Sequence, residues 1–457
     1  MDLFNPADRR PVHFMGVGGA GMSALAVLAC RRGVVVSGCD TDLAGAQDVI
    51  AAGADVRQGH DPSHVIGARA VIVTAAVSAA HPELEAARAA GIPVVPRKEA
   101  LGQLVRGRSV VALAGTHGKT TTTVMTTLAL EAAGLAPTGL AGGRVAAWGG
   151  NARLGGDALY VVEADEYDQA FLTLYPDVTV VNNVEPDHLE CYGSVEQLEA
   201  AFVEFAGRAR VAILAADDGG ARRVSARVGT TVWRFGTAED ADLRIGRVEQ
   251  DAQGSRADVT LPDGKRVVLS LRVPGMHNIR NATGALGAVV ALGGSVERAL
   301  EALAAFSGVG RRFDRLGEAG GVIVVDDYAH HPSELAATLA AARQAYPERR
   351  LVAVFQPHLY SRTREHGVAM GEALAAADLA IVTDVYGARE APVPGVTGAI
   401  VADAAARSGA QVIYEPDRAR LTAAVGERLR SGDLVLTLGA GDVTRVGPEL
   451  LARRTEP

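Results

Sequence analysis

Glycines, a lysine and two threonines are closely spaced in the segment 114–121, which reads Ala-Gly-Thr-His-Gly-Lys-Thr-Thr. It follows an apolar run at Val110–Ala114 and precedes a stretch with helical spacing. This arrangement is typical of a P-loop, whose amides hold phosphates, whose lysine reaches the terminal phosphates and whose hydroxyl binds Mg²⁺, although only two residues separate its glycines. Lys119 is one of only three lysines in the chain. We therefore expect a nucleotide site formed by Gly115, Thr116, His117, Gly118, Lys119, Thr120 and Thr121.

A second cluster of glycines lies near the start of the chain, where residues 16–21 read Gly-Val-Gly-Gly-Ala-Gly. It follows an expected strand at Val12–Met15 and opens an expected helix at Met22–Cys30. Glycines in this place let backbone N–H groups approach a phosphate at a helix N-terminus. Asp40 follows about twenty residues later, where dinucleotide-binding folds contact a ribose hydroxyl. The spacing alone suggests NAD, and a glycine turn required only for packing stays open as the alternative.

Acidic residues follow two further expected strands. Residues 163–168 (Glu-Ala-Asp-Glu-Tyr-Asp) come after Leu159–Val162, and residues 185–188 (Glu-Pro-Asp-His) come after Val178–Asn182. Because parallel strands all end at the same edge of a sheet, both clusters should lie beside the P-loop. Carboxylates and an imidazole in that place suit the shell of a phosphate-bound Mg²⁺ ion. For either cluster alone, a solvated surface loop is the simpler explanation.

The segment 274–281 reads Pro-Gly-Met-His-Asn-Ile-Arg-Asn and opens another expected helix. His277 and Asn278 are either capping residues or hydrogen-bonding partners of a nucleotide base. The sequence alone does not separate these two interpretations.

Polar segments rich in His and Arg follow four expected strands in the last third of the chain. They are residues 326–332 after Val322–Val325, 356–362 after Leu351–Phe355, 384–390 after Leu379–Thr383 and 439–442 after Leu434–Leu438. Four such segments at one sheet edge favour a binding site over a requirement of folding alone.

The elements that position these residues are indicated by short apolar runs alternating with longer Ala- and Leu-rich helical stretches. That alternation is typical of βαβ units with parallel sheets. Further strands are expected at Val34–Gly38, Ala70–Thr74 and Val211–Leu214. The stretch Leu243–Val273 has a turn at Pro262–Gly264 and predicts an antiparallel insertion at a sheet edge. Polar or glycine-rich stretches near 106–108 and 308–312 divide the chain into three α/β domains.

Composition excludes several classes of function. The chain has 457 residues, of which 48% are hydrophobic and 21% charged, enough for two to four globular domains. A formal net charge of -8 argues against nucleic acid as the main partner. The absence of an apolar run long enough for a membrane span or a signal peptide indicates a cytoplasmic protein without membrane insertion. Cys30, Cys39 and Cys191 form no CxxC pair, which argues against a disulfide scaffold or a zinc site.

Taken together, the motifs resemble those of the Mur ligase family. The similarity rests on residues 16–23 (Gly-x-Gly-Gly-x-Gly-Met-Ser), 115–120, 163–166 and 185–188, and it extends from about residue 12 to 445. It implies an α/β protein with an N-terminal Rossmann-like domain (1–107) for the UDP part of a substrate, a central P-loop ATPase domain with a mostly parallel sheet (108–310) and a C-terminal Rossmann-like domain (311–457) for an amino acid. On this resemblance the first glycine cluster holds a UDP diphosphate instead of NAD.

Within the family, His117 and the segments 311–313, 327–332 and 355–358 imply UDP-N-acetylmuramate and L-alanine as substrates, with ATP and Mg²⁺. The implied reaction supplies a peptidoglycan precursor in two steps. The lactyl carboxylate first attacks the γ-phosphate of ATP, and the alanine amine then displaces phosphate from the acyl phosphate. Since two anions must meet in the first step, Lys119 and Mg²⁺ have to neutralise charge on the transferring phosphoryl group. The oligomeric state stays open.

The resemblance also implies roles for particular residues. The expected UDP-substrate contacts are Gly16, Gly18, Gly19, Gly21, Met22, Ser23, Asp40 and Ser78. The expected adenine contacts are His277, Asn278 and Asn281, and the expected metal ligands are Thr120, Glu163 and His188. Tyr328, His330 and Arg362 match positions near the alanine, where Arg362 pairs with its carboxylate and His330 is the candidate base for its amine. Lys119, His188, His330 and Arg362 are the expected catalytic residues.

Two features depart from the family pattern. Leu359 stands where some members carry an arginine. Sister ligases that add later amino acids hold a second metal with the help of a carbamylated lysine, but no lysine lies between Lys119 and Lys265 here. That device is therefore missing unless Lys265 reaches in from the insertion.

Four alternatives compete with this hypothesis. A related murein peptide ligase attaches a recycled tripeptide to the same UDP-sugar, and only the C-terminal pocket separates the two. Folate polyglutamylating ligases share the central architecture but lack an N-terminal glycine domain of this kind. An NAD-dependent oxidoreductase would use Gly16–Gly21 and leave Lys119 without a role. A nucleotide-gated switch would turn over ATP slowly and without regard to either substrate.

Overall fold

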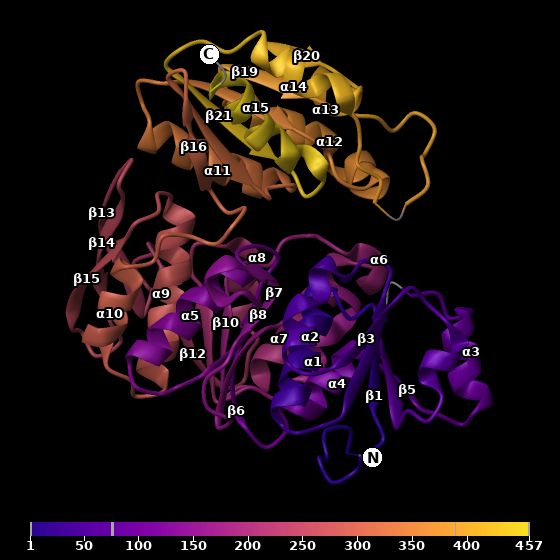
Figure 1. Ribbon diagram of the computed structural model, residues 1–457. Helices are drawn as coiled ribbons and strands as arrows, with labels where there is room; N and C mark the ends of the chain where they lie inside the picture. Colours follow the sequence, from indigo (N-terminus) through magenta and orange to yellow (C-terminus); the bar gives the residue numbers. More distant parts are fainter. Residues whose placement is uncertain (1, 75–76, 389, 456–457) are drawn as a thin grey trace. The chain divides into compact units, whose positions relative to one another are not determined.

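The computed structural model describes residues 2–74, 77–388 and 390–455 (Figure 1). The chain forms two compact units. The first comprises residues 1–246, 258–269 and 280–304, and the second comprises residues 247–257, 270–279 and 305–457. Three sheets carry the architecture, with five, ten and six strands.

The first sheet is parallel throughout and lies in the first unit. Its strand order is β3 (Asp55–Gln58), β2 (Val36–Asp40), β1 (Val12–Met15), β4 (Ala70–Val73) and β5 (Val94–Pro96). The helices connected to it are α1 (Ala20–Arg31), α2 (Gln47–Ala51), α3 (Pro82–Ala89) and α4 (Arg97–Leu104). Because the order reverses direction at β1, the glycine segment after that strand lies where open α/β sheets bind their ligands.

The second sheet has ten strands and contains the P-loop strand near its middle. From one edge the order begins with β8 (Gly150–Arg153), β7 (Thr138–Val145), β9 (Leu159–Glu163), β6 (Ser109–Ala114) and β10 (Val178–Val181). It continues with β11 (Val211–Ala215), β12 (Thr231–Gly236), β13 (Leu243–Asp251), β14 (Gly254–Thr260) and β15 (Arg266–Leu271). The neighbours β9, β6 and β10 are parallel, so their carboxyl ends meet at one edge.

The helices that follow these strands are α5 (Lys119–Ala132), α6 (Leu189–Tyr192), α7 (Val195–Gly207), α8 (Gly219–Ser225), α9 (Met276–Ala291) and α10 (Val296–Ala304). The expected turn at Pro262–Gly264 is present, since the Gly264 N–H donates to the Leu261 carbonyl at 2.9 Å. Lys265 at this turn forms an ion pair with Glu297 and therefore does not stand in for the missing carbamylated lysine.

The third sheet lies in the second unit. Its order is β16 (Asp314–Ala319), β17 (Val322–Asp327), β21 (Asp433–Leu438), β18 (Arg350–Phe355), β19 (Leu379–Val382) and β20 (Val412–Tyr414), with only β16 antiparallel to its neighbour. The helices of this part are α11 (Pro332–Ala345), α12 (Tyr360–Leu374), α13 (Ala399–Arg407), α14 (Arg418–Gly426) and α15 (Val446–Thr455).

Both faces of the third sheet are buried. Val325 and Leu436 belong to one apolar cluster with α11, α12 and α13, whereas Val324 and Val435 belong to a second cluster with α14 and α15. Successive side chains of a strand point to opposite faces, so a strand buried on both sides needs an unbroken apolar run. This requirement explains why the central strands were recognisable from their sequence.

The structure confirms the expected strands, with ends that differ by one or two residues. One expected run, Val34–Gly38, is shifted to Val36–Asp40, so that Asp40 ends the strand. In the described part of the chain, no helix is both long and apolar enough to span a membrane.

Candidate active site

The P-loop connects β6 to α5 and depends on two glycines. Gly115 and Gly118 have φ values of 131° and 78°, which L side chains rarely adopt. A Cβ at Gly115 would lie 3.0 Å from the Asn183 carbonyl oxygen, and one at Gly118 would lie 2.8 Å from Asn281 Oδ1. The loop thus lies next to Asn281 of α9.

Lys119 is the buried cation of this loop. Its Nζ donates to Glu166 Oε1 at 2.8 Å and Oε2 at 2.7 Å, and to the Gly115 carbonyl at 2.8 Å. Burial alone would lower the pKa of Lys119, but attraction to Glu166, Asp165 and Glu163 outweighs it and raises the pKa. Lys119 is therefore a fixed positive charge at the edge where β6 and β9 end.

Thr120 and Glu163 form an oxygen pair beside Lys119. Thr120 Oγ1 donates to Glu163 Oε1 at 3.1 Å, and the other carboxylate oxygen accepts from the Gly142 N–H at 2.5 Å. Burial raises the pKa of Glu163 despite that hydrogen bond. Adjacent ligands of an octahedral Mg²⁺ ion lie about 2.9 Å apart at metal–oxygen distances near 2.0–2.1 Å. The separation and the oxygen-only chemistry of this pair therefore fit Mg²⁺.

Two asparagines that the sequence analysis did not single out hold the P-loop in place. Asn183 Oδ1 accepts from the His117 N–H at 2.7 Å, and Asn182 Nδ2 donates to Thr122 Oγ1 at 2.8 Å. Both follow β10, the strand next to the P-loop strand. Their position at a strand end was the available signal, but neither residue type alone marks a nucleotide site.

His188 lies in a strained backbone position after β10. Its φ of 56° is left-handed, its ring meets that of Tyr167 edge-on at 5.0 Å, and its Nε2 lies 3.7 Å from Asp187 Oδ2. Non-glycine residues in this conformation are uncommon and tend to occur at functional sites. Tyr167 directly follows Glu166, so His188 packs against the segment that carries the partner of Lys119.

The three expected adenine contacts all lie at the start of α9. Asn278 is buried, and its Nδ2 donates to the Pro274 carbonyl at 2.8 Å. His277 folds back over Gly275, where a Cβ would lie 2.5 Å from its Cε1. Asn278 therefore ties the first turn of α9 to the segment before it, while Asn281 lies against the P-loop.

The first glycine cluster forms a tight loop between β1 and α1. The Cys39 carbonyl accepts from the Gly16 N–H at 2.8 Å and from the Val17 N–H at 3.1 Å, and Asp40 Oδ2 accepts from the Gly18 N–H at 2.9 Å. Gly16 has a φ of 67°. The Asp40 carboxylate thus fixes the loop itself.

The other expected UDP contacts differ in exposure. Gly19 precedes the first residue of α1, whereas the side chains of Met22 and Ser23 are buried in that helix. Ser78 is exposed in a turn before α3. The sequence analysis missed Arg97, the first residue of α4, whose Nη1 would lie 2.5 Å from a Cβ at Gly21. Arg97 is thus a cation placed directly at the glycine loop.

In the second unit, Tyr328 and His330 pack together after β17. Their rings meet edge-on at 5.2 Å, and the guanidinium groups of Arg311 and Arg312 lie 4.9 and 4.6 Å from the Tyr328 ring centre. His330 Nδ1 faces the Tyr328 carbonyl at 3.0 Å and Glu334 Oε2 at 3.2 Å. Because both neighbours are acceptors, this geometry favours the tautomer with the proton on Nδ1.

The Asp327 carboxyl group connects the segment after β17 to the turn at Phe313. It is buried, and its two oxygens accept from the Phe313 and Ala329 N–H groups, each at 2.8 Å. Burial raises the pKa of Asp327 from 3.8 to about 6, although the charge of Arg312 and these hydrogen bonds oppose the shift. Phe313 has a φ of 49°, so this carboxyl holds a strained turn in place.

Arg362 lies in the first turn of α12, shortly after the strand end that carries His358. The His358 ring lies 6.1 Å from His330 and 6.0 Å from Tyr386, which follows β19. Neighbouring parallel strands therefore bring three of the polar segments expected from the sequence to one edge. Leu359, in the position noted as a departure, adopts a φ of 69° immediately before α12.

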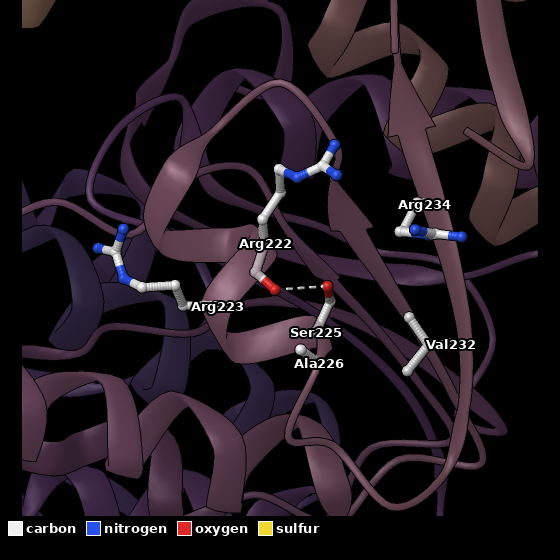
Figure 2. A pocket seen from close by; sticks show the side chains of 6 residues that line it. All are labelled: Arg222, Arg223, Ser225, Ala226, Val232 and Arg234. Atoms are coloured by element: carbon white, nitrogen blue, oxygen red, sulfur yellow. Dashed lines mark hydrogen bonds between the residues drawn. The ribbon is translucent and has the colours of Figure 1, made fainter. Parts of the chain in front are cut away.

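A surface hollow of about 500 Å³ lies in the first unit (Figure 2). It is lined by Arg222, Arg223, Ser225, Ala226, Val232 and Arg234. Asp240 pairs with Arg222 and Arg234, and Glu199 pairs with Arg223. Each arginine of the hollow therefore already has an acidic partner.

A mostly parallel sheet with a P-loop at its carboxyl edge, a largely buried lysine and a neighbouring hydroxyl–carboxylate pair defines a nucleotide-binding α/β protein equipped for phosphoryl transfer. Models of three domains match successive parts of the chain: the Mur ligase family catalytic domain at residues 11–109, the Mur ligase middle domain at 113–289 and the Mur ligase glutamate ligase domain at 311–441. The chain belongs to the Mur ligase family, and it is an ATP-dependent ligase.

Known proteins similar to this chain match over nearly its whole length. The UDP-N-acetylmuramate--L-alanine ligase of Streptomyces griseus is 44% identical over 98% of this chain and 97% of its own. That of Kineococcus radiotolerans is 46% identical over 96% and 95%. The structure of UDP-N-acetylmuramate-alanine ligase MurC from Thermotoga maritima has a TM-score of 0.81 at 26% identity and covers 97% of this chain and 98% of that one. These matches confirm the three-domain α/β fold expected from the sequence.

Proposed function

We propose that the chain joins L-alanine to the lactyl carboxylate of UDP-N-acetylmuramate through an acyl phosphate, with conversion of ATP to ADP and phosphate. The observation that carries the proposal is the buried Lys119 beside the Thr120–Glu163 oxygen pair, on a chain 44% identical to a ligase with this name. The reaction would supply a peptidoglycan precursor in the cytoplasm, where ATP and UDP-activated sugars are made.

The first step demands that a carboxylate approach a triphosphate. The amides of Gly115–Gly118 would hold the phosphates, and Lys119 would leave Glu166 to contact the terminal one. Thr120 and Glu163 would hold Mg²⁺, with His188 as a further ligand; the ion supplies positive charge to the phosphate oxygens. The residues of the glycine loop, with Arg97, would bind the UDP diphosphate.

The second step demands a neutral amine. Arg362 would pair with the alanine carboxylate, for which a guanidinium fork is well shaped. His330 Nε2 would take a proton from the amine as it attacks the acyl phosphate carbonyl. Tyr328, fixed between two arginines and His330, would line the amino-acid pocket, while Asn281 would contact adenine together with the start of α9.

Phosphate release tests the acceptor directly. The protein is incubated with ATP, Mg²⁺ and UDP-N-acetylmuramate, and L-alanine, the recycled tripeptide and no acceptor are compared. We expect release that requires both the UDP-sugar and L-alanine and falls at least 100-fold in Lys119→Ala. Release with the tripeptide alone would make the chain a murein peptide ligase, and release indifferent to both substrates would contradict the ligase assignment of the site.

A further inference from the structure

Three side chains of the first unit converge on the sulfur atom of Cys39. Cys39 Sγ, at the end of β2, lies 3.4 Å from His13 Nε2 of β1 and 3.3 Å from His60 Nδ1, which follows β3. It lies 3.4 Å from each carboxylate oxygen of Glu83 in α3. His60 Nδ1 and Glu83 Oε2 are 3.0 Å apart. His13, Cys39 and Glu83 are all buried.

The separations from Cys39 Sγ match those between the ligands of a tetrahedral metal ion. With metal–sulfur bonds near 2.3 Å and metal–nitrogen or metal–oxygen bonds near 2.0–2.1 Å, neighbouring ligand atoms lie about 3.3 to 3.6 Å apart. The three distances from Cys39 Sγ fall in this range. One thiolate, two imidazoles and one carboxylate are also the ligand types that Zn²⁺ accepts.

Hydrogen bonds already connect these side chains. His13 Nδ1 faces Ser37 Oγ at 3.0 Å, His60 Nδ1 faces Glu83 Oε2 at 3.0 Å, and the Cys39 thiol donates to Glu83. A thiol has a single proton, whereas a divalent cation is attracted to every ligand atom that surrounds Cys39 Sγ.

Neighbouring residues fix the orientation of the candidate ligands by hydrogen bonds, as is usual around metal sites. Ser37 fixes the ring of His13, and Glu83 Oε1 accepts from the Asp61 N–H at 2.9 Å and faces His64 Nδ1 at 2.9 Å. Partners of this kind hold first-shell ligands in productive orientations. The imidazole of His81 meets that of His60 edge-on at 4.9 Å.

One ligand of the cluster reaches the surface of the protein. His60 is exposed at the edge of the cluster and offers a path inward.

We propose that His13, Cys39, His60 and Glu83 form a binding site for a divalent cation of the Zn²⁺ type. Binding releases the Cys39 proton to solvent and forms a metal–thiolate bond, with no change of oxidation state. The sequence argued against a zinc site because it has no CxxC pair. The other three ligands lie 21, 26 and 44 positions from Cys39 and meet it only in the folded chain. The inference does not rest on the proposed function.

Cobalt titration tests the site independently of ligase activity. The full-length protein is stripped with a chelator and titrated with Co²⁺ in excess Mg²⁺, while the near-ultraviolet absorption of a Co²⁺–thiolate bond is recorded. We expect saturation at one equivalent and displacement by Zn²⁺. Cys30→Ser, a cysteine in α1 outside the cluster, should leave the signal unchanged, and Cys39→Ser should abolish it.

A second variant guards against misfolding of Cys39→Ser. His60→Ala keeps the thiol and removes one partly exposed ligand, and it should weaken Co²⁺ binding at least ten-fold. Absence of thiolate absorption in the unmodified protein, its persistence in Cys39→Ser, or unchanged affinity in His60→Ala would each overturn the four-ligand site.

Discussion

Lys119 Nζ lies between the two oxygens of the Glu166 carboxylate, 2.8 and 2.7 Å from them, at the start of α5. Glu166 is buried and the Lys119 side chain is only 15% exposed, so each charge depends on the other. Burial raises the pKa of Glu166 although Lys119 opposes it. A triphosphate in the P-loop offers Lys119 a second negative partner. The Glu166 carboxylate thus holds the positive charge of Lys119 in place beside the nucleotide site.

Glu166→Gln should show how much stability is lost when the charge of Lys119 has no carboxylate partner. Without nucleotide, we expect the free energy of unfolding to fall by about 3 kcal/mol, because an uncompensated buried charge remains. ATP should then stabilise the variant more than the unmodified protein, since its phosphates replace the lost carboxylate. Melting temperatures with and without ATP measure this difference. Glu190→Gln, an exposed carboxylate, is the control, and equal ATP-induced shifts in all three proteins would contradict the prediction.

Glu163→Gln should specifically impair the use of Mg²⁺. The amide removes the negative charge beside Thr120 but keeps an oxygen and nearly the same shape. We expect the Mg²⁺ concentration for half-maximal activity to rise at least ten-fold. Glu131→Gln, farther along α5, should leave the Mg²⁺ dependence unchanged. A normal Mg²⁺ titration of Glu163→Gln would remove this residue from the metal site.

Gly21→Ala tests the role of Arg97 at the first glycine loop. The added methyl would lie 2.5 Å from Arg97 Nη1 and displace the guanidinium group. We expect the KM for UDP-N-acetylmuramate to rise about ten-fold with kcat little changed, as for a lost ground-state contact. Gly207→Ala, where nothing lies within 4 Å of the added methyl, is the matched control. An unchanged KM would show that Arg97 does not contact the substrate.

The pKa of Asp327 predicts how stability depends on pH. Its native pKa of about 6 exceeds the ordinary 3.8, so the native state binds the proton more tightly than the unfolded state. The stability gained from this proton is present below pH 3.8 and is lost as pH rises through 6, a change on the order of 3 kcal/mol. Asp327→Asn should lack this loss, whereas Asp417→Asn at the exposed start of α14 should retain it. Urea unfolding between pH 4 and 7 measures this difference. The same pH dependence of the free energy of unfolding in Asp327→Asn and in the unmodified protein would contradict the prediction.

Sequence patterns predicted the central strands well because those strands are buried on both faces and read as apolar runs. Edge strands were missed because they are not buried on both faces and therefore lack an unbroken apolar run. β3 (Asp55–Gln58) is mostly exposed, and β16 (Asp314–Ala319) is polar, so neither has an apolar run. The strand order of the first sheet reverses direction at β1. Residues that are far apart in the sequence therefore become neighbours, and no local spacing predicts such contacts.

The candidate site was predictable where chemistry follows a strand end. Lys119, Thr120 and Glu163 meet as expected because β6 and β9 are parallel neighbours. The Glu166 partner of Lys119 and the contact of Arg97 with the glycine loop were not predicted, because each depends on side-chain direction in the folded chain. The cluster around Cys39 could not be predicted from the sequence either, because its residues come from separate strands and helices.

Transfer of oxygen tests the central claim most directly. UDP-N-acetylmuramate labelled with ¹⁸O in its lactyl carboxylate is converted with ATP, Mg²⁺ and L-alanine, and the released phosphate is analysed by mass spectrometry. Attack of the carboxylate on the γ-phosphate at Lys119 predicts one ¹⁸O atom in each phosphate and formation of the alanyl product. Phosphate without ¹⁸O would mean that water attacks ATP, and would contradict an acyl phosphate formed at this site.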